Sequence, residues 1–267
     1  MDKLIISYEQ GFDNWYVSEF YKFFHKRLLE KTNIKLEYLP INDFALKFGK
    51  KMNNNFANIF NWYNLIIYNE ESEKFFVHSW NDYAPEILKY SVENNFNLVT
   101  FSCSSNLTDS VIDEYKGKIK VEPSVYCLEN WRDLEFLKNQ NIPSKRIDKV
   151  YFAGLNYGIR ENILSKLANF TSFDIRTKNK SGEFRQKNEY YSDLANHKYG
   201  LSLNGAANIC YRDLELFALG TLNLRQPLKS KTFEPLIEGV HYVEFITDDL
   251  IHDILTNKNV DLTITHK

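Results

Sequence analysis

Short apolar segments alternate with longer amphipathic ones along this chain, and the alternation occurs in two series. In the first series, strand-like segments lie at Leu4–Tyr8, Lys35–Leu39, Leu65–Tyr68, Phe75–Val77 and Leu98–Ser102, and helix-like segments at Trp15–Leu29, Phe44–Met52 and Ala84–Val92. Alternating strands and helices are typical of a parallel sheet, because each helix carries the chain back across the face of the sheet. The pattern therefore predicts a parallel sheet flanked by helices.

The alternation restarts at Lys149. Strand-like segments lie at Val150–Ala153, Ser172–Ile175, Gly200–Leu203 and Thr221–Leu224, and helix-like segments at Arg160–Leu167, Tyr190–His197 and Arg212–Leu219. The polar segment Asn139–Asp148, which contains Pro143, separates the two series and is typical of an interdomain connection. We therefore predict an α/β protein with two Rossmann-like domains, residues 1–145 and 146–267, that face a central cleft. Ligands of such sheets bind beyond the carboxyl ends of the strands.

Composition excludes several classes of protein. The formal net charge is −2, and no block of Lys and Arg resembles a nucleic-acid-binding arm, so we expect no nucleic acid partner. Cys103, Cys127 and Cys210 are isolated in the sequence, which argues against a disulfide framework or a zinc site. No apolar run approaches the roughly 20 residues of a transmembrane helix, and no signal peptide is recognisable. We expect a cytoplasmic protein without a transmembrane segment.

Most catalytic signatures are absent from the sequence. It contains no Asp-x-Asp pair, HExxH, GxSxG, GxxxxGK[ST] or GxGxxG. The carboxylates of Asp213 and Glu215 come nearest to a metal-binding pair, but on a helix they would point to different faces. The six histidines show no ligand spacing, so packing or surface roles are expected for them. We therefore expect no metal ion and no cofactor.

The segment Gly200–Gly220 carries the most specific signal. It reads as a buried strand, a loop of small residues and a helix that ends at the C-capping Gly220. Gly205 and Ala206 leave room for a ligand beside the backbone, and the first turn of the helix offers unpaired N–H groups. Arg212 lies in that turn and is suited to grip a diphosphate by two hydrogen bonds. A tight turn with Arg212 paired to Asp213 or Glu215 at the surface is the alternative.

A second segment, Tyr151–Leu164, repeats the order of strand, glycine-containing turn and helix. Gly154 and Gly158 allow a close turn of the backbone, and Arg160 opens the following helix. A plain connection between strand and helix explains the same pattern.

Together these segments resemble glycosyltransferase family 90, which contains fungal capsule-associated proteins and animal protein O-glucosyltransferases. The matching stretches are Phe152–Gly154 with Arg160, Asn204–Ala207, Tyr211–Gly220 and Pro235–Val243. Leu155–Tyr157 departs from the family, which has a Ser-Arg-Thr sequence there, so the donor is left open. The resemblance implies a GT-B fold, inversion at the anomeric carbon, no metal, and a nucleotide diphosphate sugar, UDP-linked in the family, held by Gly154, Arg160, Asn204, Gly205, Ala206 and Arg212.

The resemblance also implies a catalytic carboxylate in the N-terminal domain, directly after a buried strand. Glu70 follows the strand-like Leu65–Tyr68 and would be the matching residue, with Asp82 as the alternative base. The alternative is that Glu70 and Glu71 belong to a solvated acidic loop without a catalytic role. The acceptor would be a hydroxyl of a glycan, a lipid-linked saccharide or a protein.

Three other functions fit the same pattern. These are a non-catalytic nucleotide- or sugar-binding protein of this fold, a GT-B fucosyltransferase that uses a GDP-sugar, and a two-domain periplasmic-type binding protein. The last should cross between its domains more than once.

Overall fold

The computed structural model describes residues 3–8, 30, 33–50, 64–79, 84–101, 106–123, 136–156, 158–178, 186–205, 208–232 and 234–244. The chain divides into two compact units: residues 1–131 with 229–234, and residues 132–228 with 235–267. The division falls after residue 131, whereas the sequence suggested residue 145. The segment 229–234 returns to the first unit, where the backbone N–H of Lys231 donates to the carbonyl of Leu107 (2.6 Å).

The first unit contains a six-stranded sheet in the order β2-β1-β3-β4-β5-β6. Its strands are β1 (Lys3–Tyr8), β2 (Lys35–Pro40), β3 (Asn64–Asn69), β4 (Lys74–Ser79), β5 (Leu98–Phe101) and β6 (Lys120–Val121). Strand β3 is antiparallel to both of its neighbours, and the remaining pairs are parallel. The sheet is therefore mixed, and the prediction of a parallel sheet is wrong at β3. The reason is the four-residue connection between β3 and β4, which is too short for a crossover and forms a hairpin.

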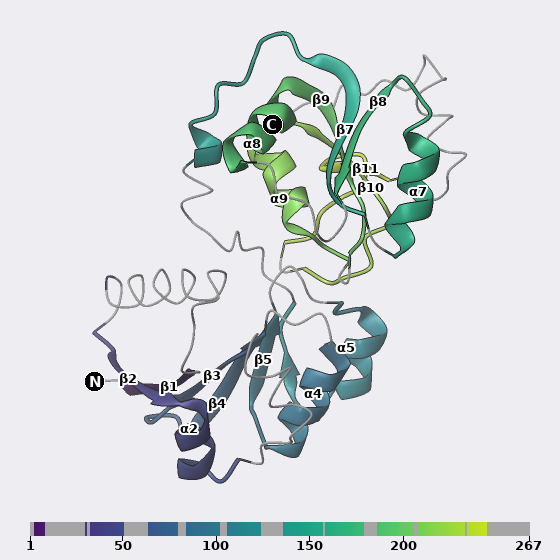
Figure 1. Ribbon diagram of the computed structural model, residues 1–267. Helices are drawn as coiled ribbons and strands as arrows, with labels where there is room; N and C mark the ends of the chain where they lie inside the picture. Colours follow the sequence, from purple (N-terminus) through teal and green to yellow (C-terminus); the bar gives the residue numbers. More distant parts are fainter. Residues whose placement is uncertain are drawn as a thin grey trace. The chain divides into compact units, whose positions relative to one another are not determined.

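Three helices of the first unit are described: α2 (Ile41–Lys47), α4 (Ala84–Glu93) and α5 (Asp109–Tyr115). Their apolar side chains join those of the sheet in one core, which includes the fully buried Phe44, Ile87, Leu88 and Val99. Ile5, Ile66, Val77 and Val99 contribute from the neighbouring strands β1, β3, β4 and β5, so one face of these strands is buried in this core. Figure 1 shows α4 and α5 beside each other over this sheet.

The second unit contains a five-stranded sheet in the order β11-β10-β9-β7-β8, and every pair in it is parallel. Its strands are β7 (Ile147–Leu155), β8 (Phe173–Lys178), β9 (His197–Ser202), β10 (Leu222–Arg225) and β11 (Tyr242–Glu244). The chain moves outward from β7 to β8, returns to the other side of β7 to form β9, and continues to β10 and β11. The order of the strands thus reverses between β7 and β9, which is the point where doubly wound sheets bind their ligands.

Helices α7 (Ile159–Leu167), α8 (Lys187–Asn196) and α9 (Tyr211–Ala218) connect these strands. Figure 1 shows α8 and α9 together on one side of β7 and α7 on the other. Leu164 and Leu167 of α7 pack on Val150 and Phe152 of β7. The predicted cap of α9 is confirmed, since Gly220 adopts a φ of 58°, a conformation that favours glycine, directly after the helix.

Candidate functional site

The carboxyl ends of β7 and β9 bring together the residues that the sequence analysis selected in the second half of the chain. Gly154 lies near the end of β7, and Asn204 and Gly205 follow β9. Arg160 lies in the first turn of α7, and Arg212 in the first turn of α9. Ala206 lies outside the described residues. The two selected segments, more than forty positions apart, therefore meet at the switch point of the sheet.

Arg212 crosses from α9 to β7. Its Nη2 donates to the carbonyl of Ala153 and its Nη1 to that of Leu201 (3.5 Å), while the guanidinium carbon lies 4.4 Å from the ring centre of Phe152. Gly154 makes this position possible, because a Cβ there would lie 2.9 Å from Nη2 of Arg212. The guanidinium is thus held over the end of β7 by contacts from two strands.

A tyrosine separates Arg212 from the nearest carboxylate. Nε of Arg212 donates to the hydroxyl of Tyr190 (3.3 Å), and that hydroxyl donates to Oε2 of Glu215 (2.6 Å). Asp213 points elsewhere, to Arg225 and Asn223, so the alternative pairing of Arg212 with Asp213 is wrong. With Glu215, Arg212 is linked through the hydroxyl of Tyr190.

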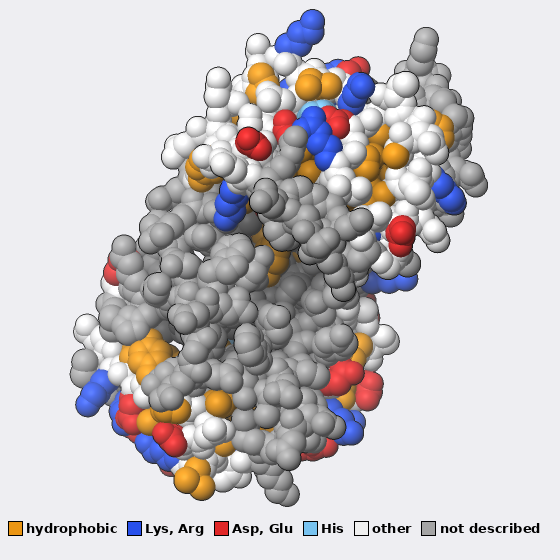
Figure 2. Space-filling view, viewed as in Figure 1, with side chains coloured by type: hydrophobic (Ala, Val, Ile, Leu, Met, Phe, Trp, Pro, Cys, Tyr) orange, Lys and Arg blue, Asp and Glu red, His pale blue; other side chains and the backbone are white. Residues whose placement is uncertain are grey.

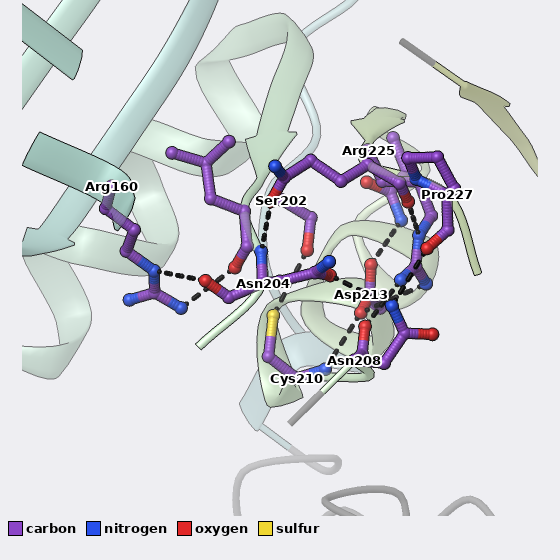
Figure 3. A network of polar contacts seen from close by, with 11 residues as sticks. Arg160, Ser202, Asn204, Asn208, Cys210, Asp213, Arg225 and Pro227 are labelled. Atoms are coloured by element: carbon purple, nitrogen blue, oxygen red, sulfur yellow. Dashed lines mark hydrogen bonds and ion pairs between the residues drawn. The ribbon is translucent and has the colours of Figure 1, made fainter. Parts of the chain in front are cut away.

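Arg160 binds the opposite side of the switch point. Its Nε donates to the carbonyl of Asn204 (2.9 Å) and its Nη2 to that of Leu203 (2.8 Å). Gly158, the residue that caps α7, has a φ of 57° and a ψ of −132°, a conformation suited to glycine, and α7 has no side-chain cap. Arg160 thus fixes the loop after β9 to the start of α7, as Figure 3 shows.

The first turn of α9 is capped by the chain itself. The buried carboxylate of Asp213 accepts hydrogen bonds from the backbone N–H of Cys210 (3.0 Å) and the side-chain amide of Asn223 (2.8 Å). This negative charge occupies part of the helix N-terminus that the sequence analysis offered to a phosphate. The expectation that the N-terminus of α9 is wholly open to an anion is therefore wrong, because Asp213 occupies part of it. The start of α7 carries no such carboxylate cap.

Arg225 is a residue of the site that the sequence analysis missed. It is 1% exposed, and its Nη1 lies 3.4 Å from Oδ2 of Asp213. Its Nη2 donates to the carbonyl of Asn208 (2.6 Å) and its Nε to that of Gln226 (2.9 Å). A charged residue directly after the strand-like segment Thr221–Leu224 was the available signal, because a buried charge needs a partner.

Two amides fasten the loop between β9 and α9 to the end of β10. The backbone N–H of Asn204 donates to the side chain of Gln226 (2.8 Å), and the side-chain amide of Asn208 donates to the carbonyl of Pro227 (2.8 Å). The side chain of Asn208 also donates to that of Asn204 (3.3 Å). Figure 3 shows these contacts around Asn204 and Asn208. These two residues are thus held by Arg160, Gln226 and Arg225.

No family model matches the chain. A search of the curated proteins likewise finds no match.

Cys210 lies beside the site but does not supply a reactive thiolate. Burial, together with the negative charge of Asp213, raises the pKa of its thiol. The sulfur lies 3.1 Å from the hydroxyl of Ser202, with which it shares a hydrogen bond. A protonated thiol in this position packs the start of α9 on β9.

Of the two candidates for a catalytic base, the structure describes the position of Glu70 but not that of Asp82. Glu70 lies in the hairpin turn after β3, and because β3 is antiparallel, that turn lies at the amino-terminal edge of the other five strands. Its carboxylate pairs with Lys3 at the start of β1 (2.9 Å). The structure therefore places Glu70 at the edge opposite to the one where ligands of such sheets bind. Asp82 lies outside the described residues.

None of the helices in the described ranges has both the length and the apolar character needed to cross a membrane. No group of three or more Asp, Glu, His and Cys side chains there is arranged to hold a metal ion. On the face drawn in Figure 2, the described basic side chains of the second unit lie among acidic ones.

Proposed function

We propose that the chain is a glycosyltransferase whose second unit binds the diphosphate of a nucleotide-sugar donor. The donor is a UDP-sugar, and the sugar passes with inversion, and without a metal ion, to a hydroxyl of a glycan, a lipid-linked saccharide or a protein. The proposal includes a GT-B fold with two Rossmann-like domains.

The observation that carries the proposal is the meeting of Gly154, Arg160, Asn204 and Arg212 at the switch point between β7 and β9. Arg212 uses three N–H groups on Tyr190, Leu201 and Ala153. A guanidinium carries five, so the contacts with described residues leave two N–H groups for another acceptor. Two donors on a fixed plane match the oxygens of a diphosphate.

The same residues supply the chemistry that the transfer needs. Negative charge grows on the diphosphate as the sugar leaves, and a cation held in place before the reaction stabilises that charge without reorganising. Arg212 is held in this way by contacts to β7, β9 and α8. The uncapped start of α7 adds the partial positive charge of its first turn.

The first experiment measures binding. Uridine, guanosine and adenosine diphosphates are added to the purified chain, and the midpoint of thermal unfolding is recorded. A specific rise with UDP, in buffer containing EDTA, supports the proposed donor. A rise with GDP alone redirects the proposal to a fucosyltransferase, and no rise with any nucleotide rejects it.

The second experiment measures turnover. Release of UDP from a panel of UDP-sugars is followed in the presence of candidate acceptors. Arg212→Ala should lower turnover by about two to three orders of magnitude, because one charge-assisted contact in the transition state contributes roughly 2–4 kcal/mol. Arg212→Lys keeps the charge but loses the planar pair of donors, so it should retain intermediate activity. Unchanged turnover in Arg212→Ala contradicts the proposal.

One observation favours a second candidate, a nucleotide- or sugar-binding protein of this fold without catalysis. Glu70 lies at the wrong edge of its sheet to act as a base on a ligand at the carboxyl ends. Asp82 is then the remaining candidate base of the proposed enzyme. Tight UDP binding without transfer to any acceptor, together with unchanged binding in Asp82→Asn, would favour the binding protein.

A further inference from the structure

Arg212 and Glu215 lie one turn apart on α9, a spacing at which opposite charges usually form a direct ion pair. In this chain the hydroxyl of Tyr190, from α8, stands between them. It receives the Nε–H of Arg212 at 3.3 Å and gives its own hydrogen to Oε2 of Glu215 at 2.6 Å. The second carboxylate oxygen accepts the hydroxyl of Tyr191 at 3.2 Å.

This arrangement places an uncharged hydroxyl between the carboxylate of Glu215 and the guanidinium of Arg212. Both oxygens of Glu215 are satisfied by tyrosine hydroxyls, so the carboxylate has no need of the guanidinium. Burial raises the pKa of Tyr190 well above its ordinary value, so the hydroxyl keeps the hydrogen that it donates. The guanidinium therefore retains its charge and its outer donors for a ligand.

We propose that Tyr190 is a positioning residue, which screens Arg212 from Glu215 and orients the guanidinium toward a diphosphate. The inference rests on the proposed function, because it takes the anion of the donor as the ligand. Without the hydroxyl, no group would stand between Oε2 of Glu215 and the Nε–H of Arg212, and the two could bond directly. The resulting ion pair would compete with the diphosphate.

Two neighbouring tyrosines give a matched pair of variants. Tyr190→Phe and Tyr191→Phe each remove one hydroxyl bound to Glu215, and Tyr190→Phe also removes the acceptor of the Arg212 Nε–H. Both keep the ring, and the rings of the two residues pack at 5.2 Å. A general loss of packing between α8 and α9 would therefore affect both variants alike.

The experiment is isothermal titration of UDP, and of inorganic pyrophosphate, into the full chain and its variants, with thermal unfolding recorded for each. Tyr190→Phe should raise the Kd about tenfold, and Tyr191→Phe should change it less than twofold. Adding Glu215→Gln to Tyr190→Phe should restore the Kd to within about threefold, since the competing charge is then gone.

Other results overturn the inference. Equal weakening by the two tyrosine variants, no weakening by Tyr190→Phe, or no restoration by Glu215→Gln each contradicts the screening role. If Tyr190→Phe does not fold, Glu215→Gln alone decides: a Kd within about threefold supports the screen, and a much tighter Kd means that Glu215 already neutralises Arg212. If the unmodified chain binds neither probe, the proposed function itself fails. If it binds and the variants contradict the expected pattern, only the screening role of Tyr190 fails.

Discussion

The guanidinium of Arg212 lies where a side chain at Gly154 would be, at the end of β7. A Cβ at position 154 would lie 2.9 Å from Nη2 of Arg212, closer than real Cβ contacts allow, so the absence of a side chain lets the guanidinium reach the carbonyl of Ala153. The relationship joins two segments that the sequence analysis selected separately. A single added methyl group at position 154 can therefore test the position of the guanidinium.

Gly154→Ala should displace the guanidinium of Arg212 without strain in the backbone. We expect the Kd for UDP to rise about tenfold, the equivalent of about 1.4 kcal/mol, because the displaced guanidinium loses its fixed plane. Titration calorimetry measures the change. Gly200→Ala is the contrasting variant: its Cβ would lie 2.1 Å from Leu216, so it should lower stability by about 1–3 kcal/mol through overpacking. Normal UDP binding by Gly154→Ala would contradict the role given to this contact.

Asp213→Ala should strongly destabilise the second unit. Asp213 and Arg225 are 0% and 1% exposed, and removal of one partner leaves the other charge buried without compensation. The expected loss in the free energy of unfolding is about 3–5 kcal/mol, measured by urea denaturation. Asp148, which pairs with Lys198 at the surface, gives the control: Asp148→Asn should leave the transition unchanged. If both variants lost the same free energy of unfolding, the buried pair would contribute no more to stability than the surface pair.

The stability of the chain should fall in acid in a way that depends on His78. Burial lowers the pKa of His78 from 6.5 to about 4. The unfolded chain therefore binds a proton on this residue at a higher pH than the folded chain does. The contribution to stability is complete above pH 6.5 and is lost as the pH falls toward 4, by roughly 3 kcal/mol in total.

Urea denaturation of the unmodified chain and of His78→Gln, between pH 4 and pH 8, measures this contribution. The variant should lose less stability across this range, because glutamine does not titrate. The carboxylates that also titrate in this range are common to both chains, so their effect cancels in the difference. Parallel curves for the two chains would disprove the assignment to His78.

Glu70→Gln should leave sugar transfer and UDP binding unchanged. Glu70 lies at the amino-terminal edge of the first sheet and pairs there with Lys3, away from the carboxyl ends of the strands. Turnover is the readout, with Asp82→Asn as the companion variant that should abolish transfer if Asp82 is the base. A large loss of turnover in Glu70→Gln, with normal stability, would return Glu70 to the reaction and refute the topological argument.

The α/β class, with two sheets, and most elements of the second unit follow from the sequence alone. The predicted strands at Val150–Ala153 and Gly200–Leu203 overlap β7 and β9, and the predicted helix Arg212–Leu219 matches α9 within one residue at each end. These predictions succeed because hydrophobic periodicity, helix caps and glycine turns are properties of neighbouring residues. Gly220 is a case in point, since its capping role needs no distant partner.

The tertiary structure alone decided which residues face one another. Arg212 and Ala153 are 59 positions apart, and the direction of β3, which moved Glu70 to the opposite edge, depends on pairing with β1 and β4. The buried partner of Asp213 is Arg225, not the adjacent Arg212. Local pattern fixes the periodicity of a segment, but strand pairing and the burial of charges minimise the free energy of the whole chain, so contacts distant in sequence are set only when the sheets form.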